Sequence, residues 1–367
     1  MFSKFAGSKV FYHLDHVKRT LEGERTFPVH INIHTTNYCN HRCVWCSAYE
    51  SQKDKSNDQD FDVLVSAMRD ATGLGLKAVT HIGNGDPTLY GRFRDLINVL
   101  HDAGLEQGIL THGGFPPSYR DDMIGAFTWI RFSLDAASAK THEKVHGNEI
   151  PLADVACFDS VMDNIKALVD GRESPESLTI GVQFALHQEN FHELGLAANM
   201  VKGLGADYFA VKPVYKIGAV GIRTSRYQLD WPQVLDEIKA LEELNGDGFE
   251  ILYKPYQFQV NNAPYYADGN QDLEPTFVRN YKKCYAANFE WWIENNFDVS
   301  VCHASKKIVG NLKEQTVKAI LNSQRYGDVV DGINIEECFR GCRPHNMNEV
   351  LHALENPDFG IHKNFVG

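Results

Sequence analysis

The chain has 367 residues, of which 43% are hydrophobic and 23% charged, a composition that can bury the core of one large domain or of two domains. Its formal net charge is -12 and it has no stripe of lysine and arginine residues, which argues against a nucleic-acid partner but does not exclude a nucleotide. No apolar run approaches the roughly 20 residues of a bilayer-spanning helix, and the N-terminus lacks the apolar stretch of a signal peptide, so we expect no membrane association.

Strand-like and helical patterns alternate along most of the chain. Residues 1–28 are expected to form a short, partly helical lead-in. Strands are predicted near 29–36, 77–83, 106–112, 128–135, 178–186 and 207–213. Helices are predicted near 60–74, 91–103, 117–126, 154–170, 191–203 and 231–245. This alternation predicts a parallel sheet with right-handed crossovers, and by itself it suits a doubly wound sheet as well as a barrel.

Several predicted strands carry polar residues on one face only. One strand alternates apolar residues with Arg131, Ser133 and Asp135, and the strands that carry His34 and Gln183 show the same alternation. A sheet covered by helices on both faces should instead be almost continuously apolar. The pattern therefore predicts either an enclosed space that holds a polar ligand or a solvent-facing sheet.

The first strand leads into a group of three cysteines, Cys39, Cys43 and Cys46. Thiolates are the usual ligands of iron-sulfur clusters, and three of them leave one iron of a 4Fe-4S cluster open. The amino and carboxylate groups of a methionine-like ligand can chelate such an iron. A zinc site, with His41 or a distant residue as fourth ligand, is the alternative. The short spacing favours metal ligation in a reducing compartment, so we expect a cytoplasmic protein.

The spacing C-x3-C-x2-C, with Trp45 directly before the last cysteine, resembles the radical S-adenosylmethionine (SAM) enzymes. The resemblance implies a partial (β/α)6 TIM-like barrel over residues 29–250, whose lumen holds SAM and the substrate. It also implies that an electron from the cluster cleaves SAM to a 5'-deoxyadenosyl radical, a chemistry that belongs to the cofactor. Such an enzyme uses a flavodoxin-type or ferredoxin-type electron donor.

The resemblance extends to the segment 83–87, which follows the second strand and is similar to the family's glycine-rich segment around the SAM amino group. Asp86 stands where the family usually has Glu. Ser133 and Asp135 match polar positions that contact the SAM ribose or carboxylate, and Arg131 is expected to pair with that carboxylate. The SAM contacts implied by the resemblance are Trp45, Gly83, Asn84, Gly85, Asp86, Pro87, Arg131, Ser133, Asp135 and Gln183. His142 and His146 are expected to be uninvolved surface residues.

A second cysteine group lies in residues 251–367. Two strand-like runs joined through an Asn-Asn turn predict a β-hairpin that brings Cys284 and Cys302 to the same end. Together with Cys338 and Cys342 the hairpin resembles the Twitch or SPASM-like appendage of radical SAM enzymes, in its short form with one cluster. This resemblance implies an auxiliary 4Fe-4S cluster held by all four thiols. A four-thiolate zinc hairpin is the alternative.

The two centres together predict a radical SAM oxidoreductase. We expect it to abstract hydrogen from a small polar substrate, such as a sugar, an aminocyclitol or a nucleotide sugar, and to pass an electron to the auxiliary cluster. Oxidation of an alcohol in this way needs a general base, for which His34, Lys212 and Tyr215 are the candidates. Redox-neutral epimerisation, dehydration or decarboxylation, and modification of a ribosomal peptide, are alternative functions.

Overall fold

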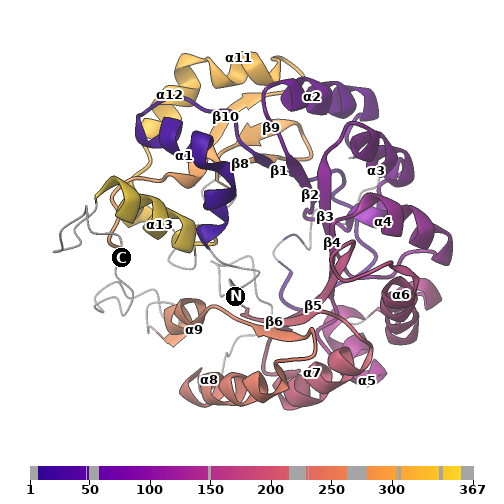
Figure 1. Ribbon diagram of the computed structural model, residues 1–367. Helices are drawn as coiled ribbons and strands as arrows, with labels where there is room; N and C mark the ends of the chain where they lie inside the picture. The colour runs from indigo at the N-terminus through magenta and orange to yellow at the C-terminus, as the bar shows by residue number, and fades with distance from the viewer. Residues whose placement is uncertain are drawn as a thin grey trace.

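A computed structural model of the chain describes residues 7–46, 48, 58–147, 150–214, 229, 231–262, 279–302, 304, 307–338 and 342–356. A curved parallel sheet encloses a lumen, and helices cover its outer face (Figure 1). The seven parallel strands in chain order are β1 (His30–Ile33), β2 (Ala78–His81), β3 (Glu106–Thr111), β4 (Trp129–Ser133), β5 (Thr179–Leu186), β6 (Tyr208–Pro213) and β7 (Glu250–Leu252). The predicted partial barrel is confirmed. The strand β7 extends it beyond the six strands that the sequence suggested, because Glu250 pairs with Tyr208.

The C-terminal region adds three strands to the other edge of the same sheet. These are β8 (Glu290–Ile293), β9 (Asp298–Ser300) and β10 (Ile308–Asn311), and the sheet order is β10-β9-β8-β1-β2-β3-β4-β5-β6-β7. The predicted hairpin is present, with β8 antiparallel to β9. In addition, β8 runs parallel to β1, with Glu290 opposite His30. The hairpin is therefore part of the barrel wall, and the boundary proposed near residue 250 stays a prediction.

The outer helices bury one apolar face each against the sheet. They are α2 (Phe61–Gly73), α3 (Phe93–Asp102), α4 (Arg120–Ala126), α6 (Phe158–Gly171), α7 (Leu194–Gly203) and α8 (Trp231–Ala240). In α2, the Asp60 carboxylate caps the first turn by accepting from Asp62 N and Val63 N, both at 3.0 Å. Leu64 and Met68, one turn apart, are fully buried in the core.

The lumen face of the sheet carries the larger polar and aromatic side chains. On β4, Ile130 and Phe132 are fully buried in the core on the helix side, while Arg131 lies on the opposite face and is also buried. The Tyr208 ring lies over Gly181 on the neighbouring strand, and a Cβ at Gly181 would be only 2.1 Å from that ring. A glycine is needed here because the aromatic ring occupies the place of a side chain.

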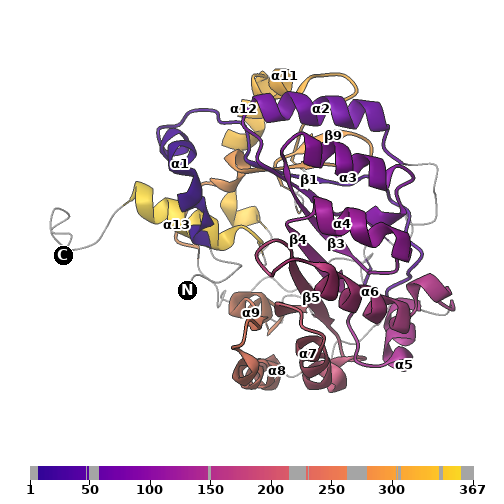
Figure 2. The same ribbon diagram turned by 45° about the vertical axis from the view of Figure 1, so that its right-hand side comes forward.

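The lead-in packs against the C-terminal region (Figures 1 and 2). A 3-10 helix (Gly7–His13) and α1 (Leu14–Leu21) contact α13 (His345–Glu355), and His16 Nε2 lies 2.8 Å from Asn288 O. They share a second, smaller core, formed by Val10, Val17, Tyr281, Tyr285, Phe289, Ile335 and Leu351. The remaining helices are α5 (Ala139–His142), α9 (Pro255–Asn262), α11 (Val317–Leu321) and α12 (Gln324–Asp331). None of the described helices is both long enough and apolar enough to cross a bilayer.

Replacing Gly181 by Ala should destabilise the barrel, because the added Cβ overlaps the Tyr208 ring. We expect a loss of about 1–3 kcal/mol, the usual range for overpacking. The matched control is Gly125→Ala, at an exposed helical position with no other atom within 4 Å of the added Cβ. It should raise stability by about 0.5–1 kcal/mol. Denaturant unfolding of both variants measures the difference, and equal midpoints would contradict the close packing.

Candidate functional site

The first cysteine group lies on a loop that is fixed by hydrogen bonds on both sides. On one side, Asp86 N donates to Tyr38 O at 3.0 Å. On the other side, Arg42 N donates to His146 O at 2.6 Å and Val44 N to Val145 O at 3.0 Å. The loop follows the carboxyl end of β1, where open α/β sheets place their ligands. The thiols are thus presented on a pre-formed backbone.

Gly85 lets the glycine-rich segment approach this loop. A Cβ at Gly85 would lie 2.3 Å from the Tyr38 carbonyl oxygen, so no other residue fits without moving the loop. The sequence predicted that the glycines let the backbone approach SAM, whereas Gly85 approaches the cysteine loop. Gly83 is less constrained, since the nearest atoms to its Cβ would be 3.4 Å away. Gly83 and Asn84 line a cavity together with Cys46.

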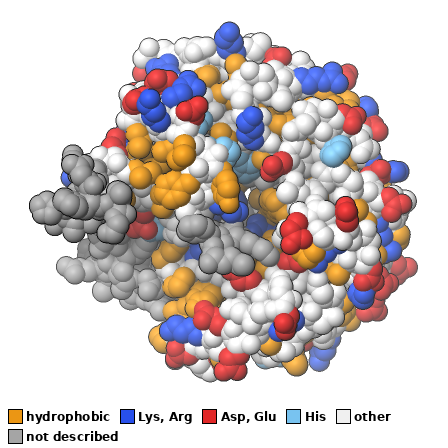
Figure 3. All heavy atoms as spheres, viewed as in Figure 1, with side chains coloured by type: hydrophobic (Ala, Val, Ile, Leu, Met, Phe, Trp, Pro, Cys, Tyr) orange, Lys and Arg blue, Asp and Glu red, His pale blue; other side chains and the backbone are white. Residues whose placement is uncertain are grey.

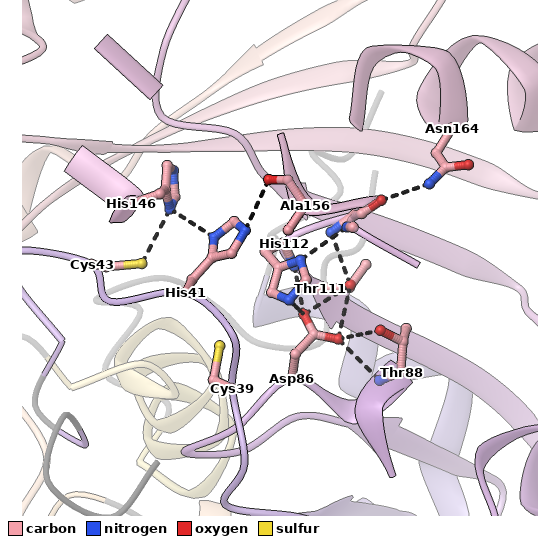
Figure 4. A network of polar contacts seen from close by, with 12 residues as sticks. Cys39, His41, Cys43, Asp86, Thr88, Thr111, His112, His146, Ala156 and Asn164 are labelled. Carbon is pink, nitrogen blue, oxygen red and sulfur yellow. Dashed lines mark hydrogen bonds and ion pairs between the residues drawn. The ribbon is translucent and has the colours of Figure 1, made fainter. Parts of the chain in front are cut away.

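The Asp86 carboxylate is buried and saturated by protein donors. It accepts hydrogen bonds from Thr88 N (3.0 Å), Thr88 Oγ1 (2.6 Å), Thr111 Oγ1 (2.9 Å) and His112 N (2.7 Å), as Figure 4 shows. Pro87 follows it as the first residue of a short 3-10 helix. The carboxylate therefore joins the segment after β2 to the end of β3 beneath the cysteine loop, and its predicted contact with SAM stays a prediction.

Four buried histidines lie behind the loop: His41, His112, His142 and His146. His41 stacks on His112 with ring centroids 3.9 Å apart. His146 Nδ1 lies 3.1 Å from Cys43 Sγ and 3.3 Å from His41 Nδ1 (Figure 4). Burial lowers the pKa of His41 well below its usual value and that of His142 to about 2. The rings of His41 and His142 are therefore neutral at physiological pH.

The expectation that His142 and His146 lie on the surface is wrong. The helix α5 and the π-helical turn Glu143–Gly147 direct both rings inward, where each is 1% exposed. Sequence reasoning missed them because a His-rich loop after a strand has no period that distinguishes an inward from an outward face. The apolar residue Val145 between them, which is fully buried, was the available signal.

Asp135 supports this histidine group. It has a positive φ of 57°, and its carboxylate accepts from Ala185 N and lies 3.3 Å from His146 Nε2. His146 Nε2 also lies 3.0 Å from Leu134 O, an acceptor, so this nitrogen carries the ring proton. Asp135 thus contacts protein groups on two sides, and its predicted contact with SAM stays a prediction. The carboxylate orients the ring that faces Cys43.

Ser133 and Gln183 are neighbours across β4 and β5. The Gln183 Oε1 atom is buried and has no hydrogen-bond partner among the described residues. Such an atom is costly unless a ligand or water satisfies it. Trp45 packs near His187, with ring centroids 5.6 Å apart. The unpaired Gln183 Oε1 fits a polar ligand, and the predicted contacts of Trp45, Ser133 and Gln183 with SAM stay predictions.

The three thiols lie close enough to influence one another. Burial raises the pKa of Cys39 to about 12, with further contributions from Asp86 and Cys46. Burial raises the pKa of Cys43 well above its usual value, and the thiols of Cys46 and Cys39 add to the effect. A bound metal centre would replace these protons. Ligand atoms of His41, Cys43 and His146 also lie within 4.8 Å of one another, an arrangement that could hold a single metal ion.

The second group of thiols converges in the same way. Burial raises the pKa of Cys284 to about 11 and that of Cys342 to about 12, and the charges of Cys302 and Cys338 raise both further. Burial also raises the pKa of Cys338. The Arg279 guanidinium, which donates to Cys338 O at 3.2 Å, offsets part of the rise in pKa at Cys338 and Cys342. This cation can balance the charge of an anionic centre, so the residues present fit an iron-sulfur cluster.

Two cavities share Arg343 in their linings. The smaller, about 150 Å³, is lined by Cys46, Gly83, Asn84, His34 and Arg343 among others. The larger, about 320 Å³, is lined by Arg131, Lys212, Lys254, Glu290 and Arg343 among others. Arg343 directly follows Cys342 in the chain, so the segment that carries Cys342 borders both cavities.

Two of the three predicted bases line these cavities. His34 is 1% exposed and its Nδ1 lies 3.1 Å from Glu294 Oε2. Lys212 has its pKa lowered well below the usual value by burial and by the nearby Arg131 and Arg343. Tyr215 lies outside the described residues, so its predicted role stays a prediction.

Matches to two family models indicate which kind of metal centre the two cysteine groups belong to. Residues 33–171 match the family model of the radical SAM superfamily, and residues 284–344 match the SPASM iron-sulfur cluster-binding domain. The chain belongs to the radical SAM superfamily. As a radical SAM enzyme with this second domain, it uses SAM, a SAM-binding 4Fe-4S cluster and an auxiliary cluster. The zinc alternatives have no support from either match.

Individual relatives are distant. A tungsten-containing aldehyde ferredoxin oxidoreductase cofactor-modifying protein of Pyrococcus furiosus is 27% identical over 234 residues, 61% of this chain and 62% of the relative. A probable GTP 3',8-cyclase of Saccharolobus islandicus is 27% identical over 173 residues, 46% of this chain and 53% of the relative. Both are thus matched over less than two thirds of their length. The structure of Streptococcus suis SuiB bound to S-adenosylmethionine has a TM-score of 0.64 at 14% identity. The match covers 93% of this chain and 76% of the SuiB chain, and at this identity it shows a common fold alone.

Arg131 and Cys46 line different cavities. Arg131 lines the larger one with Lys212, whereas Cys46, which belongs to the group expected to hold the SAM-binding cluster, lines the smaller one with Gly83 and Asn84. On β4, Arg131 also lies two residues before Ser133, further from the carboxyl end of the strand. The predicted pairing of Arg131 with the SAM carboxylate stays a prediction.

Gly85→Ala should remove the first cluster of this radical SAM enzyme and leave the auxiliary one. The added Cβ would lie 2.3 Å from Tyr38 O and must displace the cysteine loop. Since each 4Fe-4S cluster has four irons, we expect the iron content to fall from about eight to about four per chain.

The control for this prediction is Gly83→Ala, in the same segment, whose Cβ would make only ordinary contacts. Iron analysis and electron paramagnetic resonance of anaerobically reconstituted protein measure both variants. Full iron in Gly85→Ala would show that the loop tolerates the displacement.

Proposed function

We propose that this radical SAM enzyme abstracts a hydrogen atom from a small polar substrate and oxidises it, with the auxiliary cluster as electron acceptor. The observation that carries the proposal is the larger cavity, whose lining includes Arg343, the residue that directly follows Cys342 and also lines the cavity that contains Cys46. A volume of about 320 Å³ is in the range of small-molecule sites. It supports a metabolite-sized substrate, within which a sugar, an aminocyclitol or a nucleotide sugar remains our expectation.

The residues divide the work between the two ends of the lumen. Cys39, Cys43 and Cys46 are proposed to hold the first cluster, which when bound supplies the electron that splits SAM into methionine and a 5'-deoxyadenosyl radical. Gly83 and Asn84 would border SAM, and Gln183 Oε1 offers it a buried acceptor. The second group of thiols is proposed to hold the acceptor cluster.

His34 is the best placed of the candidate bases. It lines the cavity that contains Cys46, and Glu294 fixes its ring and compensates a positive charge on it. In an alcohol, loss of the carbon-bound hydrogen to the 5'-deoxyadenosyl radical leaves a substrate radical. His34 would take the hydroxyl proton, and the auxiliary cluster, when bound by the second group of thiols, would accept the remaining electron, so that the substrate leaves as the ketone. The balance is one SAM consumed and two hydrogens removed per substrate molecule.

Modification of a peptide is the second candidate. Streptococcus suis SuiB has been solved bound to its precursor peptide SuiA, and it covers 93% of this chain with a TM-score of 0.64. At 15% identity this likeness supports a common fold, and it gives no evidence on the substrate of this chain. The relatives named for a cofactor and for GTP favour a small molecule.

The division of labour between the centres can be tested by paired variants. Cys43→Ala should abolish formation of 5'-deoxyadenosine, because the first cluster loses a ligand. Cys338→Ala should retain it, uncoupled from product, because only the electron acceptor is damaged. Chromatographic assay of 5'-deoxyadenosine in dithionite-reduced protein measures both. Equal loss in the two variants would rule out separate roles.

His34→Gln should keep SAM cleavage but slow oxidation by about 100-fold or more, the lower range for loss of a general base. Coupled mass spectrometry should find a product two mass units lighter than the substrate, one per SAM consumed. A mass-neutral product would instead establish a redox-neutral reaction. If the rate of oxidation were unchanged in His34→Gln, the general base would have to be another group.

A further inference from the structure

The larger cavity gathers positive charge in an acidic protein. Five cationic side chains line it, and among the described lining residues Glu290 is the single carboxylate. The cations come from five separate parts of the chain: Lys9, Arg131, Lys212, Lys254 and Arg343. Blue side chains are visible deep in the central hollow of the molecule in Figure 3. The whole chain has a formal net charge of -12, so this local excess of positive charge is opposite in sign to the net charge of the protein.

Holding these cations together in a partly buried cavity costs the protein free energy. Arg131 is 6% exposed, and its guanidinium lies 5.6 Å above the Trp129 ring. Lys254 Nζ donates to Arg343 O at 3.0 Å, and Arg343 lies 5.2 Å above the Trp292 ring. Burial and then Arg343 lower the pKa of Lys254 to about 8, and the same causes act on Lys212. Like charges in a partly desolvated site repel one another, and a bound anion removes that repulsion.

Glu290 neutralises little of this charge. Its Oε1 accepts from Asn32 Nδ2 at 2.6 Å, which directs that oxygen toward β1. If all five cations are charged, one carboxylate leaves four positive charges. A single carboxylate ligand would still leave three, whereas a diphosphate carries enough charge to balance the site. Two guanidinium groups also match the geometry of phosphate oxygens.

We propose that the larger cavity is an anion site and that the molecule it binds is a phosphate ester or diphosphate of metabolite size. Arg131, Lys212, Lys254 and Arg343 bind the phosphate oxygens, with Lys9 at the exposed rim. The identification of this molecule as the substrate rests on the proposed function, while the anion site itself does not. SAM is assigned to the smaller cavity under the proposed function, because Cys46 lines that cavity, and the larger one is left for another molecule.

The test is calorimetric titration of inorganic pyrophosphate into the full chain, anaerobically reconstituted and saturated with SAM. We expect one site. Arg131→Gln and Lys212→Met should each weaken binding about tenfold or more, the usual loss for a charged hydrogen bond. Glu290→Gln should tighten binding several-fold, since it removes the opposing charge and keeps an acceptor for Asn32. Lys318→Gln, an exposed position on α11, is the matched control and should change nothing.

Iron content and thermal midpoint confirm that each variant is folded. Undetectable binding, or equal affinities of wild type, Arg131→Gln and Lys212→Met, would overturn the anion site. Malonate binding as tightly as pyrophosphate would overturn the phosphate class in favour of a dicarboxylate. Formation of 5'-deoxyadenosine is measured in the same samples. Its absence with intact pyrophosphate binding would refute the proposed function alone, and the reverse result would refute this inference alone.

Discussion

The contacts of one buried carboxylate hold the catalytic end of this molecule together. Asp86 accepts from the residues that end β3 and from the short helix after β2, and its own backbone N–H holds the cysteine loop at Tyr38. A buried carboxylate is expensive unless every oxygen is paired, and here protein donors meet that need. The thiols that receive the cluster are consequently positioned by sheet geometry. Loss of this anchor would free the loop without disturbing the barrel core.

The same sheet also brings the second centre to the lumen. Because β8 pairs with β1, the hairpin that carries Cys284 and Cys302 continues the barrel wall, and Arg343 reaches both cavities from the neighbouring segment. A tethered appendage would leave the distance between the centres undefined. Incorporation of the strands into one sheet fixes that distance, as the proposed transfer of an electron to the auxiliary cluster requires.

Much of this could be predicted from the sequence. The strong periodicity of the core strands gave six strands and their helices within a few residues, and cysteine spacing identified both centres. Side-chain roles were harder. The resemblance implied that Asp86 and Asp135 contact SAM, and it did not predict the contacts of their carboxylates with Thr111, His112 and His146. A motif preserves the position of a residue on a strand, and it contains no information on which neighbour supplies the donors. The pairing of β8 with β1 was likewise invisible, since edge pairing depends on tertiary contacts.

The join between β1 and β8 has a consequence for how the polypeptide is made. Asn32 and Glu290, which meet across it, are 258 positions apart. During synthesis the first strand therefore leaves the ribosome long before its second neighbour exists, with one row of backbone amides and carbonyls unpaired. Such a distant partner slows the final closure. Delivery of iron and sulfide is best timed after translation ends, when the wall behind the cysteines is complete.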